Sequence, residues 1–196
     1  ADIEATPPEN TLTIPRPGDP TRLFVIEEFD APPVSVFSDD FESGQGEWTV
    51  GSDGADGTAW ELGAPSNVGP LDASSPANCF GTNIADDYAL DANVWLLSPA
   101  IDLTTAGGAT LRFAQFRDIE QGFDFGSIRV LDAADNSELA VIDDVIDDVT
   151  ADWEQVTKSM PDEALGKTVR IEFRFQADDI QTFAGWYLDD VEVTVP

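Results

Sequence analysis

The sequence contains no histidine, and this absence narrows the chemistry that the chain can perform. Serine and cysteine nucleophiles are usually activated by an imidazole, and zinc, copper and non-haem iron sites usually include imidazole ligands. No glycine-rich phosphate loop with its lysine is present, so nucleotide chemistry is not expected. A carboxylate pair of the glycosidase type is compatible with the composition, but no spacing selects one. We therefore predict that the protein is not an enzyme.

Cysteine and basic residues are also scarce, and no apolar run is long enough to cross a membrane. The single cysteine, Cys79, cannot form an intrachain disulfide; a buried thiol is the favoured interpretation, with an intermolecular bridge as the alternative. The chain has 39 acidic and 9 basic residues, and its formal charge is −30. This charge repels nucleic acid and anionic membranes and attracts divalent cations. We predict no nucleic-acid partner and no membrane insertion.

The start of the sequence suits a processed or trimmed protein, because the chain begins at Ala1 without a signal-like apolar segment. A strongly acidic surface stays hydrated where salt screens its self-repulsion. These features favour an extracellular or cell-surface location in a saline or calcium-rich environment.

Residues 1–33 are predicted to form an N-terminal arm that carries one strand. Residues 1–20 are rich in proline and acidic residues, which favours extended backbone and turns. Residues 21–29 (TRLFVIEEF) predict a strand that is apolar on both faces and therefore needs cover on both sides; its apolar residues are Leu23, Phe24, Val25 and Ile26. This strand could complete the sandwich of its own chain. It could instead dock into a neighbouring copy and join the copies into a donor-strand filament.

From residue 34 onward, short apolar segments alternate with clusters of glycine, asparagine, aspartate and proline, which is typical of an all-β sandwich. The length fits one domain of this kind, residues 34–196. One helical turn is expected at 162–165. The expected strands are 34–41, 47–50, 60–62, 93–98, 109–116, 126–131, 138–142, 153–157, 168–176 and 185–195.

The last expected strand carries a carboxylate on its apolar face. The period of two along a strand places Asp189 on one face with Tyr187, Val191, Val193 and Val195. A carboxylate that points inward needs a cation or a full set of hydrogen-bond donors. If the first and last strands run side by side, the acidic residues around Phe41 meet Asp189 at one sheet edge. Carboxylate oxygens of this kind bind hard cations, so the sequence predicts a calcium site there.

Several motifs, in their order along the chain, resemble the MAM-like jelly-roll domain of secreted bacterial proteins. This domain is appended to immune inhibitor A-type peptidases and to anchored surface proteins, and the resemblance runs from about residue 34 to residue 195. The motifs that carry it are FSDDFESG (37–44), GEW (46–48), WELG (60–63), LSPAIDL (97–103), ATLRF (109–113), GKTVRIEF (166–173) and GWYLDDV (185–191).

The resemblance implies an antiparallel jelly roll with a structural Ca²⁺ between its opening and closing motifs. The candidate ligands carried over position by position are Asp40, Glu42, Asp189 and Asp190. The segment 118–126 (DIEQGFDFG) departs from the pattern of many members, which have a tyrosine and two glycines after the central acidic turn. Its acidic residues are candidate ligands of a second, weaker site: Asp118, Glu120 and Asp124.

Other acidic pairs are interpreted as hydrated turns, because runs of charge usually lie on solvated surfaces. They are Asp143-Asp144, Asp147-Asp148 and Asp178-Asp179.

The five tryptophans favour core packing, but two of them, Trp60 and Trp95, are candidates for stacking on glycans. The main functional hypothesis is a non-catalytic, calcium-stabilised extracellular structural or adhesive protein. It would bind copies of itself through the N-terminal strand, or glycans or cell-surface proteins. The alternatives are a carbohydrate-binding module and an accessory domain of a secreted peptidase or glycosidase.

Overall fold

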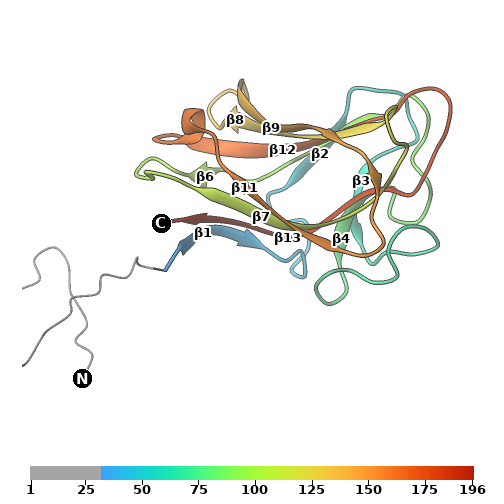
Figure 1. Cartoon of the computed structure of the whole chain (residues 1–196), viewed down its shortest axis with the longest axis horizontal. Helices are drawn as coiled ribbons and strands as arrows, with labels where there is room; N and C mark the ends of the chain where they lie inside the picture. Colours follow the sequence, from blue (N-terminus) through green and yellow to red (C-terminus); the bar gives the residue numbers. More distant parts are fainter. Residues whose placement is uncertain (1–31) are drawn as a thin grey trace, which may run out of the picture. The chain divides into compact units, whose positions relative to one another are not determined.

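The computed structural model describes residues 32–196, which form one compact unit (Figure 1). The predicted strand 21–29 lies outside the described residues, as does all of the predicted arm except Pro32 and Pro33. No helix within residues 32–196 has the length and apolar character needed to cross a membrane.

The described residues form two antiparallel sheets that pack face to face as a jelly-roll β-sandwich, which confirms the predicted fold class. One turn of 3₁₀ helix, η1 (Asp162–Ala164), lies at the predicted helical position. The seven-stranded sheet contains β1 (Val34–Asp39), β3 (Trp60–Gly63), β4 (Cys79–Thr82), β7 (Thr110–Ile119), β10 (Asp148–Val149), β11 (Glu154–Ser159) and β13 (Gly185–Val195). The six-stranded sheet contains β2 (Thr49–Ser52), β5 (Asn93–Leu97), β6 (Ile101–Asp102), β8 (Phe125–Asp132), β9 (Glu138–Ile146) and β12 (Thr168–Gln176).

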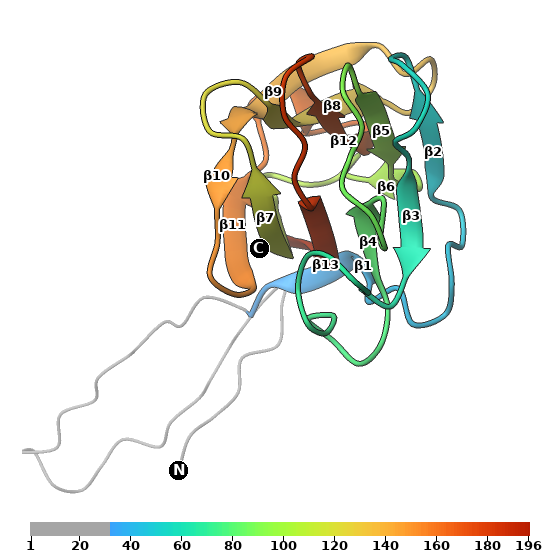
Figure 2. The same ribbon diagram turned by 90° about the vertical axis from the view of Figure 1, so that its right-hand side faces the viewer.

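The strand order brings distant parts of the chain together. In the seven-stranded sheet β7, β13, β4 and β3 follow one another, as Figure 2 shows. β1 pairs antiparallel with β13, with Asp39 opposite Val191, so the predicted pairing of the first and last strands is confirmed. In the six-stranded sheet the order is β2, β5, β12, β8 and β9, with β6 beside β12.

The core between the sheets is built from aromatic rings and branched aliphatic side chains. Trp186 is fully buried, and its ring centroid lies 5.7 Å from that of Trp60 and 5.8 Å from that of Phe173. Trp60 is only 2% exposed, so its ring lies in the core and the expectation that it stacks on glycans was wrong. Cys79 is buried as a free thiol, as predicted.

The face assignment of Asp189 also needs correction, because β13 contains a β-bulge. The pairing of β13 with β7 shifts between Asp189 and Glu192, and Asp190 has a φ of 51°. The extra residue reverses the alternation, so Val191 and Val193 face the main core while Tyr187 packs in a separate small cluster with Cys79. Asp189 is buried, as expected, but it does not share a face with the valines.

Candidate metal centre

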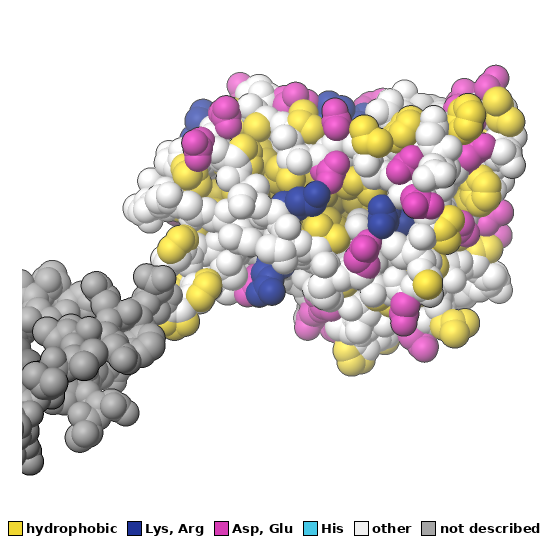
Figure 3. All heavy atoms as spheres, viewed as in Figure 1, with side chains coloured by type: hydrophobic (Ala, Val, Ile, Leu, Met, Phe, Trp, Pro, Cys, Tyr) yellow, Lys and Arg dark blue, Asp and Glu magenta, His cyan; other side chains and the backbone are white. Residues whose placement is uncertain are grey.

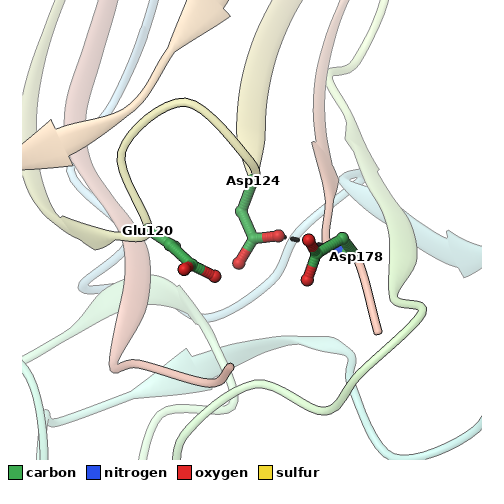
Figure 4. Close-up of side chains that lie close together, drawn as sticks. All are labelled: Glu120, Asp124 and Asp178. Atoms are coloured by element: carbon green, nitrogen blue, oxygen red, sulfur yellow. Dashed lines mark hydrogen bonds between the residues drawn. The ribbon is translucent and has the colours of Figure 1, made fainter. Parts of the chain in front are cut away.

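Three acidic side chains from two loops converge at one end of the sandwich. Glu120 follows β7, Asp124 precedes β8, and Asp178 lies just after β12 (Figure 4). One carboxylate oxygen of each lies within 4.8 Å of the others. Within residues 32–196 this is the one such group of three or more possible metal-ligating side chains, and it could hold a metal ion.

Asp124 lies at the centre of the group and is held by two donors. It is fully buried. The hydroxyl of Tyr88 donates to its Oδ2, and the backbone N–H of Asp178 donates to its Oδ1 at 2.7 Å. Burial raises the pKa of Tyr88, and the hydrogen bond to Asp124 raises it further, so this hydroxyl stays a proton donor. The carboxylate of Asp124 is therefore fixed in place before any ion binds.

The other two carboxylates each have one occupied oxygen. The backbone N–H of Ile180 donates to Asp178 Oδ1 at 2.8 Å, and the side-chain amide of Gln181 donates to Glu120 Oε1. Glu120 Oε2 is buried and has no hydrogen-bond partner among the described residues. A buried carboxylate oxygen without a donor is costly unless a cation neutralises it. This oxygen fits a site that takes a hard cation through oxygen ligands.

The group differs in one member from the predicted second site. Glu120 and Asp124 belong to it as predicted, but Asp118 lies within β7, paired with Gly185 of β13 and Val149 of β10. Asp178, which the sequence analysis interpreted as part of a hydrated turn, supplies the third carboxylate of the group. The one sequence signal for Asp178 is its position just after the end of a buried strand.

The predicted first site is assembled differently. Its carboxylates accept hydrogen bonds from the segment 74–78: Asp189 from the Ser75 N–H at 2.9 Å, Asp190 from the Ser74 hydroxyl at 3.0 Å and Glu42 from the Asn78 N–H at 2.8 Å. Asp40 and Asp190 line a cavity of about 480 Å³ beside β1. Asp40, Glu42, Asp189 and Asp190 lie near this segment, but no three of their oxygens converge as those of Glu120, Asp124 and Asp178 do. Calcium at this end of the sheet pair stays a prediction.

Asp189 makes stability depend on pH. Burial raises its pKa from 3.8 to about 6, although the N–H groups of Ser75 and Asp190 oppose this rise. The folded protein therefore keeps a proton on Asp189 that the unfolded chain loses near pH 4. The resulting stabilisation, about 3 kcal/mol, is complete below pH 4 and is lost as the pH rises through 6.

The Asp189→Asn variant should lack this loss. We expect the difference in unfolding free energy, wild type minus Asp189→Asn, to fall by about 2.5 kcal/mol between pH 4 and pH 7 in urea titrations. If the wild type instead becomes more stable relative to Asp189→Asn as the pH rises in calcium, the ionised form of Asp189 is stabilised. A calcium ion bound beside Asp189 would have this effect.

The comparisons with known proteins agree with this fold. No protein-family model matches the chain. The chain is 31% identical over 169 residues to part of bacillopeptidase F from Bacillus subtilis (strain 168), in an alignment that covers 79% of this chain. It spans about a tenth of the length of that relative, since the alignment covers 10% of bacillopeptidase F.

Among solved structures, the K1 cleaved adhesin domain of Lys-gingipain from Porphyromonas gingivalis W83 is similar, with a TM-score of 0.55 and 19% identity. The match covers 82% of this chain and 98% of that domain. TmCBM61 in complex with β-1,4-galactotriose matches with a TM-score of 0.51 and 16% identity, over 80% of this chain and 94% of that one. The chain is therefore a jelly-roll β-sandwich, similar in fold to an adhesin domain and in sequence to part of a peptidase.

Proposed function

We propose that the chain is a non-catalytic, calcium-stabilised binding module of an extracellular protein, of the MAM-like type. The convergence of Glu120, Asp124 and Asp178 around the unpartnered Glu120 Oε2 carries this proposal. The similarity to part of bacillopeptidase F and to an adhesin domain supports a module that serves a larger secreted protein in adhesion or substrate binding. The absence of histidine supports a role without catalysis.

The bound ion would connect loops that the sheets alone leave separate. Glu120 and Asp124 lie in the connection between β7 and β8, whereas Asp178 lies in the connection between β12 and β13. Asp124 orients the group, Glu120 offers the unpartnered oxygen, and Asp178 closes the site. Ca²⁺ supplies positive charge and accepts six to eight oxygen ligands in flexible geometry, which suits ligands from irregular loops better than the strict octahedron of Mg²⁺.

Assembly into a filament through residues 21–29 is part of the wider hypothesis. The residues that would donate the strand, Leu23–Ile26, lie outside the described part of the chain, so this assembly stays a prediction. A role as an accessory domain of a peptidase or glycosidase is compatible with the same module, because such a domain also binds without catalysing.

Calcium should raise the unfolding temperature of the wild type. Removing one ligand charge should leave the unfolding temperature equal or higher without calcium and lower it, relative to the wild type, with calcium. Without calcium, Asp178→Asn and Glu120→Gln relieve repulsion among three carboxylates, so each variant should unfold at or slightly above the wild-type temperature. With calcium at about 100 times its dissociation constant, the wild type gains about 2.7 kcal/mol, and each variant should lose most of this gain. Differential scanning calorimetry in calcium and in chelator measures both effects.

Asp179→Asn is the matched control, because Asp179 is the exposed neighbour of Asp178 and its replacement removes the same charge. It should retain the full response to calcium. If calcium stabilises Asp178→Asn as much as the wild type, this group does not bind the ion. If calcium has no effect on the wild type, the proposal is wrong.

A further inference from the structure

We propose that the outer face of the six-stranded sheet is a platform that binds neutral saccharides, with the indole of Trp95 as its stacking surface. This inference rests on the proposed function, because it names the ligand class of the binding module. It depends on the position of Trp95 in β5, on the glycine beneath its ring and on the polar groups beside it.

Trp95 differs from the other tryptophans, which pack in the two apolar clusters of the protein. It belongs to neither cluster and is only half-buried. The indole N–H groups of Trp48, Trp153 and Trp186 donate to protein acceptors, and that of Trp60 is buried. Among residues 32–196 the N–H of Trp95 has no acceptor and is not buried. Its ring edge can therefore donate a hydrogen bond to a ligand.

The neighbouring strand holds the Trp95 ring against the sheet. Gly51 of β2 lies directly opposite Trp95, and a Cβ placed on Gly51 would lie 2.1 Å from Cζ2 of the indole. The six-membered ring thus rests on the backbone of β2, where only glycine leaves room. The backbone of β2 covers the ring on the side of Gly51, and part of the half-buried side chain stays exposed. Such a fixed aromatic surface loses little conformational entropy when the apolar face of a pyranose ring stacks on it.

Polar groups of fixed geometry lie beside the ring. Arg174 of β12 is directly opposite Trp95 in the sheet. Its guanidinium donates to Glu172 at 2.9 Å, to Asp53 at 2.8 Å and to Asn93 at 2.7 Å. This network presents donors and acceptors in a fixed arrangement, which is what recognition of sugar hydroxyls requires.

The same row across the sheet contains a polar group without a partner. Ser127 of β8 lies directly opposite Arg174 on its other side. Ser127 is 6% exposed, and its Oγ has no hydrogen-bond partner among the described residues. Because this hydroxyl is buried, a ligand does not reach it, and the polar contacts offered to a saccharide come from the Arg174 network and the Trp95 N–H.

The charges on this face select a neutral ligand. Three of the nine basic residues of the chain lie here, namely Arg129, Arg170 and Arg174. Arg129 pairs with Glu138 at 2.8 Å and Arg174 with Glu172 and Asp53, so most of the positive charge is already balanced. Acidic side chains are scattered over the surface, as Figure 3 shows for one face, and few basic ones lie between them. A sulfated or uronic polymer would meet the repulsion of a chain of charge −30, whereas a neutral saccharide would not.

The test is isothermal titration of the full chain in calcium with three neutral probes: β-1,4-galactotriose, cellotriose and xylotriose. Trigalacturonate is the anionic comparison. We expect at least one neutral probe to bind. Trp95→Ala should weaken its binding about tenfold or more, because the stacking surface is lost. Gly51→Ala should weaken binding similarly, because its new Cβ displaces the indole without removing it.

Trp153→Ala is the control, since Trp153 is the other half-buried tryptophan. It directly precedes β11, which belongs to the seven-stranded sheet on the other side of the sandwich. The variant should leave the affinity unchanged. The inference is overturned if no neutral probe binds, if trigalacturonate binds more tightly than the neutral probes, or if affinity is lost in Trp153→Ala rather than in Trp95→Ala.

The unfolding temperature of the same samples with and without calcium separates the two proposals. A calcium response without saccharide binding refutes the platform alone. Saccharide binding without a calcium response refutes the calcium module alone.

Discussion

Replacing Asp124 by alanine is expected to destabilise the protein by about 3 kcal/mol in the presence of a chelator and to abolish its response to calcium. Asp124 is fully buried and accepts hydrogen bonds from the Tyr88 hydroxyl and the Asp178 N–H. Truncation leaves both donors without a partner, and each such buried group costs about 1–3 kcal/mol. It also removes the central ligand, so the additional gain from calcium should disappear. Urea unfolding in calcium and in chelator measures both losses.

Asp135→Ala is a suitable control for this variant. Asp135 is exposed and accepts a hydrogen bond from the Ser137 N–H at 2.9 Å, so its truncation also removes an acceptor from a backbone donor. Because water can replace that acceptor, the cost should be less than about 1 kcal/mol, and the calcium response should be intact. If Asp124→Ala resembles this control in both solutions, the buried group neither organises the loops nor holds an ion.

Trp186→Ala should produce the largest loss of stability in the core, about 3–5 kcal/mol. The Trp186 ring is fully buried between Trp60 and Phe173, and its indole N–H donates to Gln115 at 3.1 Å. Its ring also covers Gly126, where an added Cβ would lie 2.8 Å from Cε3. Alanine would leave a large cavity between the two sheets and remove the donor to the side-chain oxygen of Gln115.

The matched comparison is Trp95→Ala, the same change at a tryptophan outside the core. We expect a loss below about 1 kcal/mol there, because the half-buried ring leaves no enclosed cavity when it is removed. The midpoints of urea unfolding give both values. Equal losses for the two variants would contradict the assignment of Trp186 to the core and of Trp95 to the surface.

Regular strands with strong apolar patterns were predictable from the sequence. β12 (Thr168–Gln176) and β13 (Gly185–Val195) have the predicted bounds, because each is a long segment rich in apolar strand-forming residues. β4 (Cys79–Thr82) was not predicted, since its short run includes Gly81 and has no alternation. β6 (Ile101–Asp102) and β10 (Asp148–Val149) are two residues long and are defined by their pairing with β12 and β7, which no local pattern encodes.

The side on which a residue faces was less predictable than the strand that contains it. Periodicity locates Asp189 in β13, but the bulge at Asp190 changes which residues share its face. Trp60 and Trp95 both lie in predicted strands, yet the first ring enters the core and the second rests on the outside of a sheet. Which face is inner depends on the packing of the two sheets, and a single strand's sequence does not specify it when apolar residues lie on both sides.

The candidate metal centre was predictable only in part for a related reason. Glu120 and Asp124 are close in sequence and flank one turn, so their proximity follows from the turn itself. Asp178 is 54 residues from Asp124 and meets it only because β8 pairs with β12. Single-sequence reasoning predicts local clusters of carboxylates, but the third ligand depends on the topology of the sheet.

The location of a bound ion is the most direct test of the calcium proposal. Crystals grown with calcium, or with a lanthanide in its place, would reveal the ion by anomalous scattering. We predict a peak coordinated by Glu120, Asp124 and Asp178, with Glu120 Oε2 among its ligands. A peak only beside Asp40, Glu42, Asp189 and Asp190, or no peak at saturating calcium, would contradict the account.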